Sequence, residues 1–276
     1  MQIIDGRKIR NEILEEIKQE TDGLSFTPVF CDILVGEDPA SVQYVNMKFK
    51  TAVSLGIKFH KAFFKEDIST EDLIKEIQVL NKMENMCGII VQLPLPLHID
   101  TKKVLDAIDS DLDVDSLGEV SSTKFYQGEK VLHLPTASAC LYILDSLNID
   151  LNSKNIVVLG QGELVGKPTA FLLKQRGLNV VSLNRESVGK EEIIKDADII
   201  ISGIGQASYL KGDMLKPGVT LIDAGTSESN NSISGDVDLS SVKNVASVIS
   251  PVPGGVGPVT IAMLFKNVLQ VAKNKK

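Results

Sequence analysis

The chain has 276 residues, a formal net charge of −7 at pH 7 and 43% hydrophobic residues. Nucleic-acid binding needs clustered Lys and Arg against phosphates, so this acidic balance argues against a nucleic-acid partner. No apolar run approaches the roughly 20 residues that a membrane helix needs, so we expect no membrane span. The opening sequence MQIIDGRKIRNEIL has no basic segment followed by an apolar one and therefore predicts no secretory signal.

The cysteines are odd in number and widely spaced, at Cys31, Cys87 and Cys140. Each lies in a largely apolar segment, which indicates buried thiols in a reducing, cytoplasmic compartment. Neither the cysteines nor the three scattered histidines have metal-ligand spacing, so we expect no metal site.

Apolar periodicity and capping residues predict alternating helices and strands. In the first half we expect helices over 7–21, 39–55, 70–80 and 102–108, and strands over 28–35, 57–64 and 88–93. In the second half we expect strands over 156–159, 179–183, 198–202, 219–223 and 245–249, with helices over 136–147, through 171–176, around 193–194 and over 258–273. This alternation predicts an α/β protein with parallel sheets. We expect two lobes, residues 1–136 completed by the C-terminal helix 257–276, and residues 137–256.

A glycine-rich stretch, NIVVLGQGELVGKP, spans residues 155–168. A buried strand runs into Gly160, Gly162 and Gly166, and a helix follows. Glycine lets the backbone approach an anion closely, and a helix N-terminus favours negative charge, so the stretch suits a phosphate. The spacing is one residue longer than the usual dinucleotide fingerprint, and an ordinary tight connection is the alternative.

Arg185 follows the second strand of this predicted nucleotide lobe. An arginine there favours the extra phosphate of NADP, whereas the adjacent Glu186 would permit NAD. A solvated arginine is the alternative.

Ser41, Tyr44 and Lys48 share one face of a predicted helix. A lysine beside a tyrosine hydroxyl and shielded from water can act as a general acid or base; the alternative is an ordinary surface lysine. Gln92 lies near the end of an apolar strand, where parallel sheets collect ligands, although a solvent-facing amide would fit as well.

Two loops complete the candidates. Asp113 and Asp115 lie in the acidic loop DSDLDVDSLG, where a carboxylate can accept hydrogen bonds from a heterocycle or simply face solvent. The loop lacks the glycine and terminal glutamate of a calcium loop. The sequence PVPGGVGPVT, residues 251–260, fixes an unusual backbone path that suits either close approach to a ligand or a rigid connection.

Together these segments resemble the bifunctional methylenetetrahydrofolate dehydrogenase/methenyltetrahydrofolate cyclohydrolase family over essentially the whole chain. The matching segments are SVQYVNMKFKTAVSLGI (41–57), GIIVQLPLP (88–96), DVDSLG (113–118), GQGELVGKP (160–168), GDVDL (235–239) and PVPGGVGPVTIAML (251–264). The first, second and last are specific, and all occur in the family's order.

The resemblance implies NADP-dependent oxidation of 5,10-methylenetetrahydrofolate to 5,10-methenyltetrahydrofolate, then hydrolysis to 10-formyltetrahydrofolate. It implies a folate-binding first lobe, a Rossmann-type NADP-binding second lobe and a homodimer. It assigns proton transfer to Lys48 with help from Gln92, folate orientation to Tyr44, and pterin binding to Asp115. Further implied substrate contacts are Ser41, Pro253, Gly254 and Gly255. The implied cofactor contacts are Gly160, Gln161, Gly162, Val165, Gly166, Arg185 and Gly205.

The sequence departs from the family pattern at three places. Gly160-Gln161-Gly162 replaces the usual Gly-Arg-Ser of the cofactor turn, so a phosphate contact is missing unless Arg185 supplies it. Leu112 to Ser116 replaces Lys-Asp-Val-Asp-Gly, and Leu134 to Ala137 replaces Pro-Cys-Thr-Pro. NAD therefore stays open as the cofactor.

Two other functions also stay open, a monofunctional dehydrogenase and a non-catalytic folate- or nucleotide-binding regulator. Lys48 argues against the first, because hydride transfer alone needs no proton-transfer group. The intact set of Tyr44, Lys48 and Gln92 argues against the second.

Overall fold

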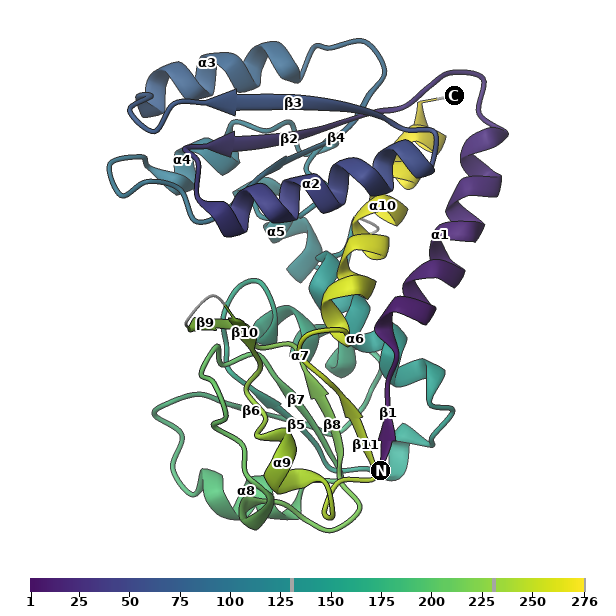
Figure 1. Cartoon of the computed structure of the whole chain (residues 1–276), viewed down its shortest axis with the longest axis vertical. Helices are drawn as coiled ribbons and strands as arrows, with labels where there is room; N and C mark the ends of the chain where they lie inside the picture. The colour runs from purple at the N-terminus through teal and green to yellow at the C-terminus, as the bar shows by residue number, and fades with distance from the viewer. Residues whose placement is uncertain (130–131, 230–231, 276) are drawn as a thin grey trace. The chain divides into compact units, whose positions relative to one another are not determined.

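The computed structural model describes residues 1–129, 132–229 and 232–275, in which two compact units are distinguished. Met1–Asn11 and Pro135–Met263 form one, here called the six-stranded unit; Glu12–Leu134 and Leu264–Lys276 form the other, the three-stranded unit (Figure 1). No helix in the described ranges is both long and apolar enough to cross a membrane.

A parallel sheet forms the centre of the three-stranded unit. Its strands are β2 (Val29–Val35), β3 (Lys58–Phe64) and β4 (Met86–Val91), with β2 in the middle. The chain crosses from β2 to β3 and then returns past β2 to β4. Right-handed crossovers therefore place α2 (Pro39–Ser54) and α3 (Thr70–Leu80) on opposite faces of the sheet (Figure 1).

Caps in the sequence fix where these two helices begin. Asp38 accepts a hydrogen bond from the Ser41 N–H at 2.8 Å, and Pro39 occupies the first turn of α2. Ser69 accepts one from the Asp72 N–H at 3.1 Å at the start of α3. Both helices begin where the sequence predicts.

Among the described residues, four further helices belong wholly or partly to this unit. α1 (Gly6–Asp22) and α10 (Val256–Asn274) each contribute one part to either unit, and α4 is Thr101–Asp106. The sequence predicts these three within a few residues. α5 (Glu119–Tyr126) is not predicted, because EVSSTKFY has little apolar periodicity.

The C-terminal part of α10 packs onto the three-stranded unit, as the sequence predicts. The Phe265 ring lies edge-on to Phe30 of β2, with ring centroids 5.2 Å apart. Asn267 Nδ2 donates hydrogen bonds of 2.8 Å to the carbonyls of Val114 and His133. Asn267 thus fastens the acidic loop to the helix.

The six-stranded unit is a doubly wound parallel sheet in the order β1-β11-β8-β7-β5-β6. Its strands are β1 (Gln2–Ile3), β5 (Ile156–Leu159), β6 (Val180–Leu183), β7 (Ile199–Ser202), β8 (Thr220–Asp223) and β11 (Val248–Ser250). The chain leaves β5 for β6 and then crosses back to β7. The strand order therefore reverses between β5 and β7, which is where sheets of this kind bind ligands.

Helices and shorter elements surround this sheet. They are α6 (Pro135–Ser146), α7 (Gly166–Gln175), α8 (Lys190–Asp196), α9 (Leu239–Val242), the 3₁₀ helices η1 (Leu151–Ser153) and η2 (Gly212–Met214), and the hairpin strands β9 (Ser227–Ser229) and β10 (Ser232–Ser234). Between the layers, Val157, Ile200, Leu221 and Ile249 are at most 1% exposed and form part of the apolar core. This is the Rossmann-type arrangement that the sequence and its resemblance predict.

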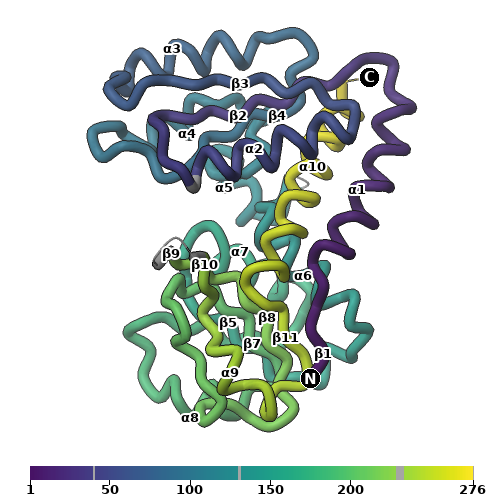
Figure 2. The backbone as a smooth tube through the Cα atoms, in the orientation of Figure 1, coloured from purple at the N-terminus to yellow at the C-terminus, as the bar shows by residue number. Residues whose placement is uncertain are grey.

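Strand β1 is not predicted from the sequence. Gln2 and Ile3 pair with Val248 and Ile249 of β11, so the beginning of the chain lies at one edge of the six-stranded sheet (Figure 2). A strand of two residues is too short to give a periodic signal. The hairpin β9–β10 and helix α9 are likewise too short to be predicted.

Candidate functional site

Lys48 is the centre of a buried polar cluster in the three-stranded unit. It lies on α2, which packs on β2 and β3, and it is 7% exposed. Its Nζ lies 2.9 Å from Gln92 Oε1 and 2.8 Å from Asp32 Oδ2. The structure therefore brings Lys48 and Gln92 together, and the alternative of an ordinary surface lysine is wrong.

Gln92 is held at the carboxyl end of β4, which ends one residue earlier. Its backbone N–H donates to the Ile33 carbonyl at 2.8 Å, and its side-chain Nε2 donates to the Leu93 carbonyl at 3.1 Å. These contacts orient Oε1 toward Lys48. The Gln92 amide is therefore hydrogen-bonded within the protein and does not simply face solvent.

Asp32 is the member of this cluster that the sequence analysis missed. It lies in the middle of β2, and its exposed fraction is 0%. Burial raises the pKa of its carboxyl, while the charge of Lys48 and its hydrogen bond lower that pKa. The available signal was a carboxylate inside an otherwise apolar strand expected to be buried on both faces.

The two candidate carboxylates of the acidic loop have different environments. Asp113 is 2% exposed, and its Oδ2 accepts a hydrogen bond from the Gly118 N–H at 2.8 Å, so it shapes the loop. Burial raises the pKa of Asp115 to about 7; Lys48 opposes this shift, and the charges of Asp113 and Asp32 add to it. Asp115 is half-buried and lies in the field of Lys48.

Tyr44 and Ser41 precede Lys48 along α2. Tyr44, one turn before Lys48, is half-buried, and Ser41 is 6% exposed. The helical phase that the sequence predicts is therefore present, with all three side chains on the sheltered side of α2.

In the six-stranded unit, glycines close the turn at the point where the strand order reverses. Gly160, directly after β5, has φ +86°, and a Cβ there would lie 2.4 Å from the Gly203 carbonyl oxygen after β7. A Cβ on Gly166 would lie 1.9 Å from the Gly160 oxygen, whereas one on Gly162 would meet nothing within 4 Å. Backbone closeness thus requires Gly160 and Gly166, the Val165 side chain leaves no room for a Cβ on Gly203, and Gly162 is under no such constraint. The sequence analysis missed Gly203.

The remaining side chains of this turn fold back onto it. Gln161 Nε2 donates to the Gly160 carbonyl at 2.6 Å, and the Val165 side chain covers Gly203 at the start of α7. The turn and the first residues of α7 therefore form a compact cradle, of the kind in which backbone N–H groups and a helix N-terminus receive a phosphate. Its geometry fits a dinucleotide pyrophosphate.

A second missed residue of the six-stranded unit, Asp236, holds the loop after β7. It is 0% exposed and accepts hydrogen bonds from Ser202 Oγ (2.6 Å), the Ile204 N–H (2.8 Å) and the Gln206 N–H (2.8 Å). Gly205, with φ +73°, lies inside this loop. The segment GDVDL contained the signal, since its first aspartate fixes one wall of the predicted cofactor site.

Arg185 is exposed in the turn after β6. The turn is stabilised by Asn184, whose N–H donates to Ser187 Oγ and whose Oδ1 accepts from the Glu186 N–H, both at 2.9 Å. Glu186 is exposed as well, so both groups that could read the cofactor's ribose are accessible.

The loop before α10 packs against the beginning of α1. Gly254 has φ +108°, and the Gly255 N–H donates to the Pro251 carbonyl at 2.7 Å. The Gly6 N–H donates to the Gly254 carbonyl at 2.9 Å, and a Cβ on Gly6 would lie 1.8 Å from the Gly255 oxygen. The loop is a rigid connection within its unit, and Pro253 is exposed on it.

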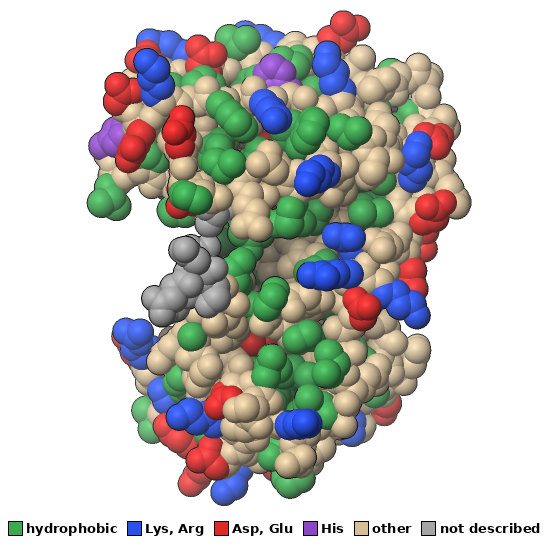
Figure 3. Space-filling model, in the orientation of Figure 1, with side chains coloured by type: hydrophobic (Ala, Val, Ile, Leu, Met, Phe, Trp, Pro, Cys, Tyr) green, Lys and Arg blue, Asp and Glu red, His purple; other side chains and the backbone are tan. Residues whose placement is uncertain are grey.

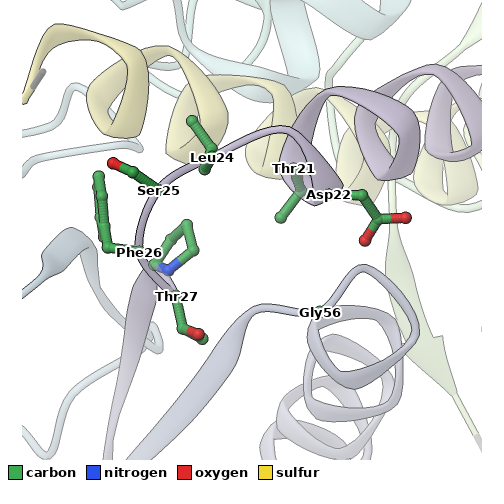
Figure 4. A pocket seen from close by; sticks show the side chains of 8 residues that line it. Thr21, Asp22, Leu24, Ser25, Phe26, Thr27 and Gly56 are labelled. Carbon is green, nitrogen blue, oxygen red and sulfur yellow. The ribbon is translucent and has the colours of Figure 1, made fainter.

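A small pocket lies elsewhere in the three-stranded unit (Figure 4). Its lining residues are Thr21, Asp22, Leu24, Ser25, Phe26, Thr27, Pro28 and Gly56. They precede β2 and follow α2, so the pocket is at the opposite end of β2 from Gln92 and has no part in the Lys48 cluster. The described residues contain no group of three His, Cys, Asp or Glu arranged to hold a metal.

Comparisons with known proteins match both units. The family model "Tetrahydrofolate dehydrogenase/cyclohydrolase, catalytic domain" matches residues 4–115, and the corresponding "NAD(P)-binding domain" model matches residues 135–276. A curated relative from Campylobacter hominis, "Bifunctional protein FolD", is 40% identical over 100% of this chain and 98% of its own length. A relative of the same name from Nitratiruptor is 41% identical over 100% and 99%.

Solved structures agree with these matches. The bifunctional FolD enzyme of Campylobacter jejuni has a TM-score of 0.95 at 35% identity and covers 100% of both chains. The Trypanosoma brucei enzyme, solved with NADP and an inhibitor, has a TM-score of 0.92 at 32% identity, covering 99% of this chain and 97% of that one.

We predict that Gly166→Ala weakens binding of the dinucleotide by at least about tenfold, because its methyl group would collide with the Gly160 carbonyl and open the turn. Gly162→Ala is the matched control, since its methyl group meets open space. Calorimetric titration of both variants measures the effect. Equal affinities for the two variants would show that the close backbone contact is not needed.

Proposed function

This chain belongs to the tetrahydrofolate dehydrogenase/cyclohydrolase family, and from that membership we propose that Lys48 manages proton transfer in its hydrolytic step. The enzyme is bifunctional: it oxidises 5,10-methylenetetrahydrofolate to the methenyl form and hydrolyses that form to 10-formyltetrahydrofolate. The supporting observation is the position of Lys48 Nζ, buried and within 2.9 Å of Gln92 and 2.8 Å of Asp32.

Hydrolysis is the step that needs such a group. Water adds to the methenyl carbon and releases one proton; the hydroxyl of the adduct then loses its proton as the formyl C=O forms, the bond from this carbon to N5 breaks, and N5 gains a proton. A buried lysine at the reacting atoms can move these protons, and the Gln92 amide can orient the attacking water or the lysine itself. A monofunctional dehydrogenase would have no use for a buried, paired lysine.

We propose that the folate is held by side chains around Lys48. The Asp115 carboxylate would accept hydrogen bonds from the pterin ring, and Tyr44 would orient the ring beside Lys48. The family resemblance also implies substrate contacts at Ser41, Pro253, Gly254 and Gly255. A non-catalytic regulator would need the pterin contacts but not the Lys48–Gln92 contact.

We propose NADP as the cofactor, as in the trypanosomal relative, with NAD as the alternative. The cradle formed by Gly160 and Gly166 fits the pyrophosphate, and Gln161, Gly162, Val165 and Gly205 line the same turn and its neighbouring loop. The bound nicotinamide supplies the hydride acceptor. Exposed Arg185 would bind the extra phosphate in place of the arginine that the turn lacks.

We further propose that residues 1–136 with 257–276 carry most of the folate site and residues 137–256 the cofactor site. The location would be cytoplasmic. Cys31, Cys87 and Cys140 are free and buried, and burial raises the pKa of each thiol, as suits a reducing compartment.

We also propose that the protein forms a homodimer through the edge of the three-stranded sheet. β3 is an edge strand, and Phe63 on it is 51% exposed. Phe49 and Val53 of α2 are 36% and 57% exposed, and apolar side chains gather over α2 and β3 in Figure 3. An exposed edge strand beside apolar side chains favours pairing with a second copy.

We predict that Lys48→Met lowers the rate of methenyltetrahydrofolate hydrolysis at least about 100-fold, the usual contribution of a general acid–base group. Lys50→Met, on the exposed side of the same helix, is the control. The measurement is the loss of methenyl absorbance, with circular dichroism to verify folding. Wild-type hydrolysis by folded Lys48→Met protein would remove Lys48 from the mechanism.

We predict that Arg185→Ala raises the Michaelis constant for NADP about tenfold and leaves that for NAD nearly unchanged, because one charged phosphate contact is lost. Lys195→Ala, an exposed cation on α8, controls for the change of net charge. Steady-state oxidation of methylenetetrahydrofolate with each cofactor gives both constants. Equal increases for NADP and NAD would contradict a role in reading the phosphate.

We predict that Phe63→Glu makes the protein monomeric, because it places a charge on the apolar edge. Val79→Glu changes an even more exposed apolar residue on α3 and should leave the dimer intact. Light scattering coupled to gel filtration measures the mass. The edge-strand interface would be wrong if the Phe63→Glu protein still had the mass of a dimer.

A further inference from the structure

The central strand of the three-stranded sheet contains a buried aspartate. Asp32 lies between β3 and β4, opposite Lys61 and Ile90 in the sheet register, and its exposed fraction is 0%. Burying a carboxylate costs free energy that an apolar residue at the same place would not. The rest of β2 is apolar and buried, so a valine or isoleucine would suit the strand better.

Lys48 is the partner of this carboxylate. Asp32 Oδ2 forms an ion pair with Lys48 Nζ at 2.8 Å, and within the described part of the chain neither carboxylate oxygen accepts a further hydrogen bond. The carboxylate is therefore not shared with the backbone, in contrast to Asp113, which accepts an N–H from its own loop. Its polar contact is directed at the proposed proton-transfer group.

Two neighbouring strands position the Lys48 side chain. Asp32 on β2 and Gln92 after β4 come from neighbouring strands, and both have an oxygen within 2.9 Å of Nζ. A lysine side chain has four rotatable bonds and three donor hydrogens, so two fixed acceptors restrict its position and leave one N–H for a reacting group. Without Asp32, one acceptor would have to hold the side chain alone.

We propose that Asp32 is a positioning residue for the hydrolytic step, which holds the Lys48 ammonium group against Gln92 and fixes the direction of its remaining N–H. This inference rests on the proposed role of Lys48 in hydrolysis. It assigns a function to a residue that touches neither substrate nor cofactor and acts through Lys48.

Asp32 also affects Asp115. The groups that act on the Asp115 carboxyl are Lys48 on α2, Asp32 on β2 and Asp113 on its own loop. Burial raises the pKa of Asp115 to about 7, and the negative charge of Asp32 contributes to that increase. Removing this charge lowers the pKa of Asp115, so pterin binding through an ionised Asp115 persists to lower pH.

The test is Asp32→Asn in the full-length protein, an almost isosteric change that removes the charge. We expect kcat for methenyltetrahydrofolate hydrolysis to fall about ten- to hundredfold with little change in KM, because misplacement by about 1 Å can cost a hundredfold. The acidic limb of the pH profile of KM for the folate should move to lower pH. Asp32→Glu, which keeps the charge, should recover part of the lost kcat. Asp22→Asn, an exposed aspartate of the same unit, is the control for net charge.

A stability cycle separates positioning from a structural role. Asp32→Val and Lys48→Met should each lower the midpoint of thermal unfolding, because each leaves one buried charge without its partner. The double variant should recover stability but not hydrolysis. Folded Asp32→Asn protein with wild-type kcat and an unmoved pH profile would overturn the proposal, even if its unfolding midpoint falls. Failure of the Lys48 role itself would show separately, as hydrolysis that survives Lys48→Met.

Discussion

Parallel strands all end at one edge of their sheet, and this constraint determines where the chemistry of both units lies. In the three-stranded unit, Gln92 follows directly after β4 and meets Lys48 from the covering helix. In the six-stranded unit, Gly160 and Gly203 follow β5 and β7, and their backbones are in contact. Neither arrangement needs a long loop or a special fold. Each follows from the strand order and from the residue type that directly follows the strand.

The two units place different chemical groups at the ends of their strands. The three-stranded unit uses charged side chains, one lysine and the carboxylates of Asp32, Asp113 and Asp115. In the six-stranded unit, glycines without a Cβ let the backbone pack closely. Its buried Asp236 stabilises a loop by accepting hydrogen bonds. The first arrangement suits proton movement, and the second suits an anion held by backbone.

Much of this could be predicted from the sequence, for identifiable reasons. Helix α2 was predictable because Asp38 and Pro39 mark its start, and with it the common face of Ser41, Tyr44 and Lys48. Gly160 and Gly166 were predictable from spacing. Asp32 was not, because its partner is on a helix and only the packing of α2 across β2 brings the two together. Gly203 and Asp236 were not predicted for the same reason, because each contacts a segment that is distant in the sequence. Spacing alone could not show which glycine lacks room for a methyl group, which is Gly166 and not Gly162.

The pairing of β1 with β11 has a consequence for the order of assembly. Gln2 and Ile3 pair with Val248 and Ile249, which follow them only after almost the whole of the α/β chain between. The loop around Gly254, against which Gly6 packs, is equally distant in the sequence. Strand β1 therefore has no neighbour in the sheet until β11 is in place. Contacts of such long sequence separation form slowly, so the edge of this sheet closes as one of the final steps of folding.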